Sequence, residues 1–137
     1  MKTKVQKKLF LICLGGGKSQ IPLIKAAKKK KINLIIIDRN KYCPGKKLAE
    51  FFLNISLDNS KKIIKEIQKL KISPKLIIGV INRSSGKASL TMSKVQKRFK
   101  LSGSEPMMVE KILNKNLFSK KCIENNILVP RIFDKIS

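Results

Sequence analysis

The sequence contains no histidine, and its eight acidic side chains are outnumbered by 32 basic ones. Its three cysteines, Cys13, Cys43 and Cys122, are far apart. Without histidine beside them they provide neither the spacing of a zinc site nor a disulfide framework. The carboxylates form no cluster along the chain, so we expect no metal ligands here. The cysteine usage favours a reducing compartment, the cytoplasm.

Long apolar runs are also absent. The run that follows the basic lead-in, residues 1–8, is interrupted by three glycines and a lysine at 15–18. It is therefore too short for a membrane span and has the wrong form for a signal peptide. We expect a soluble protein without a membrane partner. At 137 residues the chain is long enough for one domain with a real core.

Arginine and aromatic side chains are scarce for a chain with a formal charge of +24. Such a charge suggests nucleic-acid binding, because clustered cations release counterions from a phosphate backbone. Only Arg39, Arg83, Arg98 and Arg131 carry the guanidinium group that base recognition favours. No aromatics are interleaved with the basic residues to stack on single strands. We therefore interpret the lysines as a solvated surface with no specific nucleic-acid partner, and keep a basic nucleic-acid-binding protein as an alternative.

Residues 9–40 show the clearest pattern in the sequence. This pattern predicts a strand, a glycine turn, a helix and a second strand. Residues 9–14, and residues 34–37 within an expected strand at 33–37, are continuous apolar runs, typical of parallel strands covered on both faces. The glycines at 15–17 permit a sharp turn, and Pro22 lies in the first helical turn, where its missing N–H does no harm. The expected apolar face of this helix is Ile21, Leu23, Ile24 and Ala27.

The rest of the chain continues to alternate strands and helices. Strands are expected at residues 51–55 and 75–81, a short helical turn at 46–50, and helices at about 60–72, 88–99, 104–113 and 116–125. Asp58 or Ser60 is expected to cap the first of these helices and Ser104 the third, and asparagine at 125–126 can end the last. The predicted fold is α/β and Rossmann-like, a three-layer parallel sheet of about four to five strands with helices on both faces.

The glycine turn matches two nucleotide-binding motifs incompletely. Residues 17–19, GKS, resemble the end of the phosphate-binding loop, but the first glycine of that motif would fall on Ile12, inside the strand. The dinucleotide fingerprint G-x-G-x-x-G fits at its first two glycines, and Asp38 ends the second strand where a ribose partner belongs. Gln20 replaces its third glycine. A short turn between strand and helix also favours glycine for its own sake, so spacing alone gives weak support.

A longer pattern runs through LGGGKSQIPLIKAAKKKKINLIIIDRN, CPGKKLAEFFLNISLDN and LIIGVINRSSG, and ends in NKNLF at 114–118 and NILVP at 126–130. It resembles the N-terminal substrate domain, or pre-ATP-grasp domain, of ATP-grasp enzymes. These are carboxylate-amine ligases related to carbamoyl-phosphate synthase and biotin carboxylase. The resemblance spans residues 8–133. Its last part is similar to the family junction D-K-x-x-x…G-I-P-V-P, from which Asn114, Asn126 and Leu128 depart.

The resemblance implies a function and a set of site residues. Family members use ATP and Mg²⁺ to phosphorylate a carboxylate, and an amine or similar nucleophile then attacks the acyl phosphate. The N-terminal domain forms one wall of the substrate site, at the carboxyl ends of its strands. There this chain offers Gly15, Gly16, Gly17, Lys18, Asp38, Arg39, Asn82, Arg83, Ser84, Ser85 and Gly86. Lys115 matches the family lysine that reaches the nucleotide phosphates, and no residue is assigned as catalytic or as a metal ligand.

Several of these residues have two interpretations. Glycine amides and the helix N-terminus after Gly17 can receive an anion. Arg83 can hold a substrate carboxylate in a bidentate pair, or it can bridge loop carbonyls. Asp38 can pair with a substrate ammonium or hydroxyl group, or it can cap a turn. Lys18 is interpreted as solvated in preference to catalytic.

Parts of a complete ligase have no counterpart in the sequence, which lacks a second glycine-rich clamp, an adenine-facing segment and a late Glu/Asn pair for magnesium. We divide the chain into a lead-in (1–8), a Rossmann-like domain (9–113) and the start of an ATP-grasp part (114–137). We expect a fragment or split subunit that binds a small carboxylate and is not catalytic alone, with its ATP-grasp partner in cis or trans. A stand-alone Rossmann-like module for a nucleotide or small anion is the alternative, and a homodimer stays open.

Overall fold

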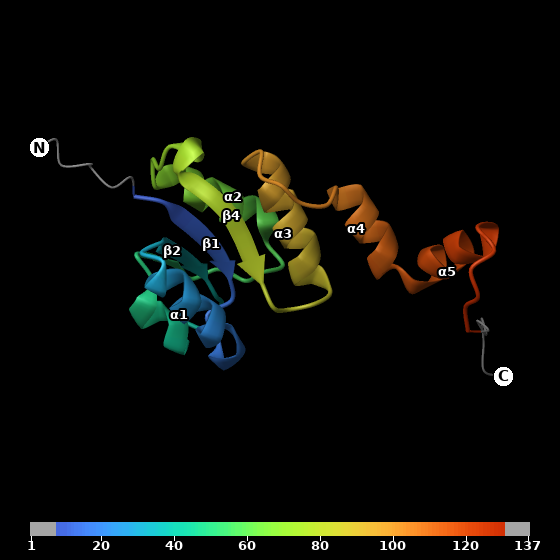
Figure 1. Ribbon diagram of the computed structural model, residues 1–137, viewed down its shortest axis with the longest axis horizontal. Coiled ribbons are helices and arrows are strands. Elements are labelled where there is room, and N and C mark those ends of the chain that lie inside the picture. The colour runs from blue at the N-terminus through green and yellow to red at the C-terminus, as the bar shows by residue number, and fades with distance from the viewer. Residues whose placement is uncertain (1–7, 131–137) are drawn as a thin grey trace, which may run out of the picture.

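The computed structural model describes residues 8–130, which form a parallel four-stranded sheet in the order β3-β2-β1-β4 (Figure 1). The strands are β1 (Phe10–Leu14), β2 (Asn33–Ile37), β3 (Phe51–Leu53) and β4 (Ile77–Asn82). From β1 the chain first moves outward through β2 and β3 and then returns to place β4 on the other side of β1. The order therefore reverses between β1 and β4, and ligands of open α/β sheets bind at such a point.

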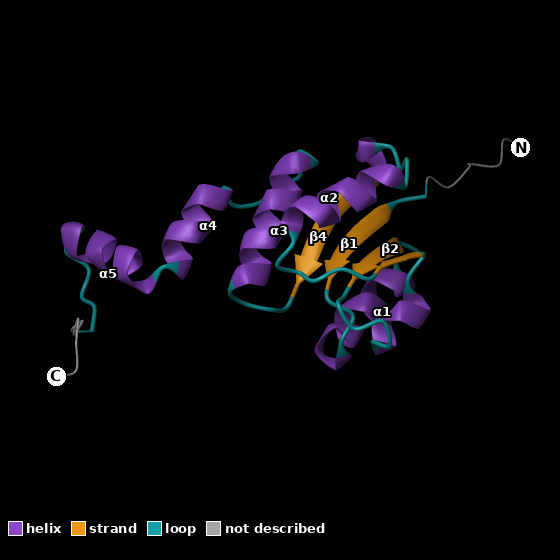
Figure 2. Ribbon diagram, turned by 180° about the vertical axis from the view of Figure 1, so that it is seen from behind, coloured by secondary structure: helices purple, strands orange, loops and turns teal. Residues whose placement is uncertain are grey.

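Helices cover both faces of the sheet (Figure 2). One face packs against α1 (Ile21–Lys29), and the other against α2 (Ser60–Lys69) and α3 (Lys87–Arg98). Beyond α3, the helices α4 (Pro106–Leu113) and α5 (Lys115–Glu124) extend away from the sheet. Short 3₁₀ turns occur at Lys18–Gln20, Pro44–Leu48 and Pro74–Leu76. The predicted three-layer α/β fold is confirmed, with four strands.

The packing of the core explains why apolar and polar residues do not alternate along the central strands. In β2 the buried Ile35 and Ile37 face α2 and α3, whereas the equally buried Leu34 and Ile36 face α1. β1 divides in the same way, with Cys13 on the α1 side. Since each face of the sheet meets a helix layer, the central positions of β1 and β2 need apolar side chains on both faces.

Two predicted helix caps are wrong. Asn59, not Asp58 or Ser60, caps α2, because its Oδ1 accepts a hydrogen bond from the Lys62 amide at 3.0 Å. The N-cap of α4 is Glu105, one residue after the expected Ser104, and its side chain makes no cap hydrogen bond. β4 also starts later than predicted because Pro74–Leu76 forms a 3₁₀ turn. The expected left-handed asparagine after the last helix is confirmed at Asn126, with φ of 57°.

The buried Cys13 gives the fold a predicted weakness at alkaline pH. Burial, aided by the nearby Asp38 carboxylate, raises the pKa of the Cys13 thiol to about 12. An unfolded cysteine ionises near pH 8.5. Between these two values the unfolded chain binds fewer protons than the folded one, so stability falls as the pH rises. We expect Cys13 to lower the free energy of unfolding by about 2 kcal/mol at about pH 10.

Urea unfolding at neutral pH and at about pH 10 measures this loss. Cys13→Ala retains every lysine and the other buried thiols, so it corrects for their titration. We expect the variant to lose less stability than the parent by that amount. Identical pH slopes in the two proteins would contradict the assignment.

Candidate functional site

A polar cavity of about 360 Å³ lies at the carboxyl-terminal edge of the sheet. Its walls come from the turn after β1, the end of β2, the residues before α2 and the loop between β4 and α3. The lining residues are Gly15, Gly17, Ser19, Gln20, Asp38, Arg39, Ser56, Leu57, Asp58, Ser84, Ser85, Lys87 and Ala88. Helices α1, α2 and α3 all begin beside it, and the partial positive charge of helix N-termini favours an anion there.

The glycine turn shapes the floor of this cavity. Gly15 has φ of +103°, a conformation that side-chain-bearing residues rarely adopt, and its N–H donates to the Ile37 carbonyl at 2.8 Å. A Cβ atom on Gly15 would lie 3.3 Å from Cγ and Nε2 of Gln20. The missing side chain therefore leaves the space in which the side chain of Gln20 lies over the turn.

Asp38 fastens the glycine turn to the end of β2. Its Oδ2 accepts a hydrogen bond from the Gly16 amide at 2.7 Å, and its Oδ1 accepts one from the Asn40 amide at 2.8 Å. The Asn54 side-chain amide also donates to the carbonyls of Asp38 and Arg39, each at 2.9 Å. Both carboxylate oxygens of Asp38 are thus engaged by the backbone, as in the turn-capping alternative.

We expect Asp38→Ala to lower the free energy of unfolding by about 2 kcal/mol, because charged hydrogen bonds to two backbone amides are lost. Denaturant unfolding measures the loss, and hydrogen exchange of the Gly16 amide should accelerate with it. Asp58→Ala is the matched control, since it removes a carboxylate that has no partner in the part of the chain the structure describes. Equal losses in the two variants would show that Asp38 does not hold the turn.

The loop after β4 is held together by its own polar side chains. Oδ1 of Asn82 accepts from the Ser84 amide at 2.8 Å, and its Nδ2 donates to the Ser84 carbonyl at 2.6 Å. Arg83 donates through Nη1 to the Ser19 carbonyl at 2.8 Å. Arg83 therefore ties this loop to the start of α1, the carbonyl-bridging alternative, and Gly86 with φ of +67° leads into α3.

The structure brings together most of the residues that the sequence predicts for the site. Those that line the cavity are Gly15, Gly17, Asp38, Arg39, Ser84 and Ser85. Gly16, Lys18, Arg83 and Gly86 lie in the same turns, and Asn82 at the end of β4, without lining the cavity. Lys115 lies elsewhere, exposed at the start of α5, where Oδ1 of Asn114 accepts from the Leu117 amide at 3.2 Å.

Sequence reasoning missed several lining residues. These are Ser19, Gln20, Ser56, Leu57, Asp58, Lys87 and Ala88. Residues 56–58 follow β3 and could have been found by the same rule that identified the ends of β1, β2 and β4. Gln20 could have been noticed for a different reason. It stands where the dinucleotide fingerprint has its third glycine, so its side chain needs space beside the turn.

The charges that line the cavity are of both signs. Within residues 8–130, the side chains of Arg39, Lys87 and Asp58 make no hydrogen bond or ion pair. The ion pairs within residues 8–130 lie outside the cavity, for example that of Lys97 with Glu105 at 2.7 Å. Both basic groups and one carboxylate are therefore available to a ligand.

The described residues do not fit a magnesium ion. Across residues 8–130, no group of three or more His, Cys, Asp or Glu side chains is placed to hold a metal. Asp38 and Asp58 both line the cavity, but the oxygens of Asp38 already accept backbone hydrogen bonds.

No helix among residues 8–130 is long and apolar enough to cross a membrane.

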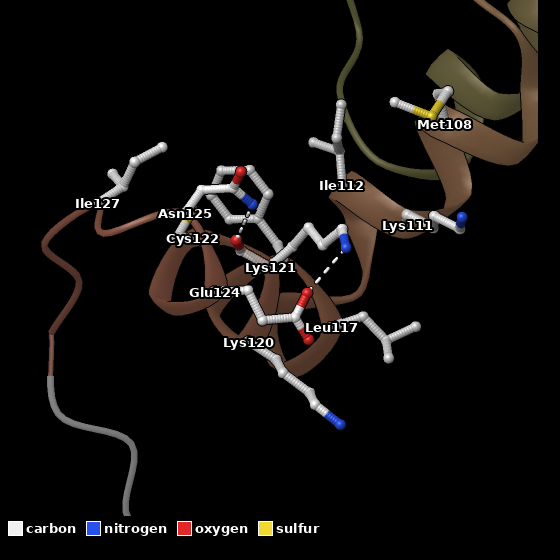
Figure 3. Close-up of a pocket in the computed structure, with 11 residues that line it drawn as sticks. Met108, Lys111, Ile112, Leu117, Lys120, Lys121, Cys122, Glu124, Asn125 and Ile127 are labelled. Atoms are coloured by element: carbon white, nitrogen blue, oxygen red, sulfur yellow. Dashed lines mark hydrogen bonds and ion pairs between the residues drawn. The ribbon is translucent and has the colours of Figure 1, made fainter.

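A second cavity, of about 610 Å³, lies between α4 and α5 and is mainly apolar (Figure 3). Met108 and Ile112 line it from α4, and Leu117 and Phe118 line it from α5. Lysines surround this α4–α5 groove, and one of them, Lys121, pairs with Glu124 at 2.8 Å. Other apolar side chains of α4, α5 and the residues after α5 are also exposed, among them Met107, Leu113, Ile123 and Leu128.

Comparisons with known proteins agree with the fold. No protein-family model and no curated protein matches the sequence. Among solved structures, phosphoribosylglycinamide synthetase from Anaerococcus prevotii matches with a TM-score of 0.74 and 19% identity. L-amino acid ligase from Bacillus licheniformis matches with 0.66 and 13%. N5-carboxyaminoimidazole ribonucleotide synthetase from Thermotoga maritima matches with 0.64 and 19%.

These matches cover 87%, 92% and 90% of this chain, but only 29%, 32% and 32% of the respective solved chains. The three structures are ATP-grasp enzymes, whose N-terminal domain has this α/β fold. At such low identities the likeness establishes the fold alone. At the level of the fold, the likeness to these structures confirms the resemblance that the sequence indicated.

Proposed function

We propose that this chain is the N-terminal, substrate-binding part of an ATP-dependent ligase. In this reaction a carboxylate becomes an acyl phosphate, which an amine or similar nucleophile then attacks. The observation that carries the proposal is the polar cavity at the strand ends of a fold that occurs as the N-terminal domain of ATP-grasp enzymes. The alternative, a module that binds a nucleotide or small anion alone, uses the same cavity.

In the proposed reaction this chain positions one substrate. The unpaired cations of Arg39 and Lys87, with the helix N-termini beside them, would neutralise the substrate carboxylate. Asp38 and Arg83 would act through the backbone, Asp38 by fixing the glycine turn and Arg83 by tying the loop after β4 to Ser19. Acyl phosphate formation depends mainly on positioning and charge neutralisation, which such a rigid wall supplies.

ATP and magnesium would be held outside the described residues. We propose that residues 9–113 form the substrate domain and that residues 114–137, of which 131–137 lie outside the described range, begin the ATP-grasp part. Lys115 would reach the nucleotide phosphates from the start of α5. A compartment that keeps Cys13, Cys43 and Cys122 reduced fits this enzyme, and we propose the cytoplasm.

The α4–α5 groove is the surface on which we place the ATP-grasp part, whether it belongs to the same polypeptide or to another. Phe118 is 46% exposed, Ile112 55% and Ile127 57%, although all three are strongly apolar and line the groove. An exposed apolar patch of this kind marks an interaction surface. The matched solved chains are about three times as long as the part that this chain covers. We therefore propose that a segment equivalent to their uncovered part packs on the groove. A homodimer would compete for the same surface.

The DNA beyond the codon for Ser137 tests this proposal. We expect the same frame, a near frameshift or an adjacent gene to encode a second glycine-rich loop and a late Glu/Asn pair. Coexpression of that segment should give carboxylate-dependent ATP hydrolysis, which Phe118→Glu abolishes without unfolding the chain. Saturable nucleotide binding by this chain alone, with no such segment nearby, would favour the stand-alone module.

A further inference from the structure

The layer of the fold that contains α1 exposes a surface of almost uniform positive charge. The 3₁₀ turn Pro44–Leu48 packs beside α1 in this layer (Figure 1). The exposed lysines of the two elements and of the turn that ends α1 form what we call the α1 lysine patch. Its members are Lys25, the four lysines at 28–31, Lys46 and Lys47.

The charges of the α1 lysine patch have no counterpart within the part of the protein that the structure describes. None of these lysines forms an ion pair among residues 8–130, whereas lysines elsewhere do, such as Lys69 with Glu66 at 2.7 Å. The nearest acidic residue in the sequence of this layer, Asp38, already accepts two backbone hydrogen bonds. Lysines that have only solvent counterions gain affinity for a polyanion when those counterions are released.

An exposed aromatic ring belongs to the same layer. Tyr42 is 79% exposed and is the only exposed large apolar or aromatic side chain of this layer. Its loop is held against the glycine turn, because the Gly45 amide donates to the Gly16 carbonyl at 2.8 Å. Nζ of Lys41 lies 5.0 Å from the centre of the tyrosine ring. An open ring on which a base can stack, beside lysines that can bind phosphates, is the combination that single-strand binding uses.

The composition of the patch favours a nucleic acid over other polyanions. Firm binding to an anionic membrane requires apolar side chains that insert beside the cations. Apart from Tyr42, the exposed large apolar side chains of residues 8–130 lie on β4, α4, α5 and the residues after α5. Interfaces with acidic proteins favour arginine, whereas this patch contains only lysine. Lysine binds phosphate as a point charge and reads no base sequence.

We propose that the α1 lysine patch and Tyr42 bind single-stranded nucleic acid, RNA or DNA, without sequence preference. The lysines neutralise backbone phosphates, and the ring of Tyr42 stacks on one base. This activity goes beyond the proposed function and does not depend on it. The α4–α5 groove lies at a different end of the molecule from α1 (Figure 1), so a strand on the patch and a partner in the groove do not compete.

Fluorescence anisotropy of the whole chain with labelled oligouridylate and oligothymidylate, each of about 12 nucleotides, tests the proposal. We expect saturable binding of at least one strand at physiological salt, and the tighter strand identifies RNA or DNA as the source. Tyr42→Ala should weaken this binding about tenfold without changing its salt dependence. Tyr42→Phe should retain the parent affinity because its ring still stacks. A duplex of the same length offers no unstacked base, so Tyr42→Ala should leave its affinity unchanged.

A pair of double variants separates the patch from the overall charge of the protein. Lys25→Gln with Lys47→Gln should lower the affinity about fivefold at physiological salt. It should also reduce the slope of log affinity against log salt by about 1.4, since each lost phosphate contact contributes about 0.7. Lys61→Gln with Lys65→Gln makes the same change of net charge at exposed positions of α2, on the other face of the sheet, and should retain the parent slope.

Loss of binding to both strands at physiological salt, or equal effects of the two double variants, would overturn the proposal, because the attraction would then reflect net charge alone. Displacement of the strand by polyglutamate at equal charge concentration would also overturn it and indicate an acidic protein. Tighter binding to phosphatidylserine vesicles than to either strand would indicate a membrane instead. Each of these outcomes leaves the proposed function intact.

Discussion

Gly45→Ala is expected to destabilise the protein by about 3 kcal/mol, the upper end of the usual cost of overpacking. A Cβ atom on Gly45 would lie 2.9 Å from both Cα and the carbonyl oxygen of Gly16, and 2.9 Å from Cδ1 of the buried Ile24. Two of these atoms belong to the backbone and cannot rotate away. The Gly45 amide also donates to the Gly16 carbonyl at 2.8 Å, so separating the two loops costs a hydrogen bond.

Gly17→Ala is the control for this prediction. Nothing lies within 4 Å of the position of its Cβ, and its φ of −69° suits any residue. We expect it to change the free energy of unfolding by less than about 0.5 kcal/mol. Denaturant unfolding compares the two variants, and equal stability would show that the loop at 43–45 does not pack on the glycine turn.

A paired variant tests the same contact from the other side. A Cβ on Gly16 would lie 2.6 Å from Sγ of Cys43, so Gly16→Ala should also be destabilising. Cys43→Ala removes that sulfur. We expect the double variant to recover part of the stability that Gly16→Ala loses.

The double variant Arg39→Gln with Lys87→Gln is expected to lower the affinity for a small carboxylate by at least about tenfold. Both side chains line the polar cavity and make no ion pair within residues 8–130, so their charges are available to the ligand. A charged hydrogen bond in a partly enclosed site contributes about 1.5–3 kcal/mol. Calorimetry with the carboxylate of highest affinity measures the loss.

A chain of charge +24 attracts any anion, so the control must change the net charge equally. Lys28→Gln with Lys29→Gln does so at the end of α1, where both lysines are exposed and outside the cavity. We expect this control to retain the parent affinity within about twofold at physiological salt, where distant charges are screened. An equal loss in both double variants would mean that the carboxylate responds only to overall charge.

The layers of the fold could be predicted from the sequence because a strand that is buried on both faces requires a continuous run of apolar residues. Residues 34–37 contain no polar position, a pattern that a central parallel strand covered on both faces requires. The edge that carries the cavity followed from the same strands. Gly15 and Asp38 were predicted for this edge because each comes directly after a strand, and Ser84 because it lies in the loop after β4, since the carboxyl ends of parallel strands meet at one edge.

What the sequence could not provide depends on contacts between distant segments. Oε1 of Gln20 is buried without a hydrogen-bond donor among residues 8–130, which can be recognised only once the side chain is placed over Gly15. Asp58 was assigned to a helix cap because aspartate is a preferred residue there, whereas Asn59 caps α2 and Asp58 lines the cavity. Lys31, Lys71 and Lys100 adopt the left-handed conformation after helices without the glycine that usually marks such an end.

An NMR titration of the ¹⁵N-labelled chain at physiological salt tests the central claim most directly. The small carboxylate that binds best is added first, and ATP with magnesium is added to a second sample. We predict that the carboxylate shifts the amides of Gly15, Gly17, Ser85 and Ala88 saturably, and that ATP leaves them unshifted. Saturable shifts of the same amides by ATP, with displacement of the carboxylate, would contradict the substrate-binding assignment and identify the cavity as a nucleotide site.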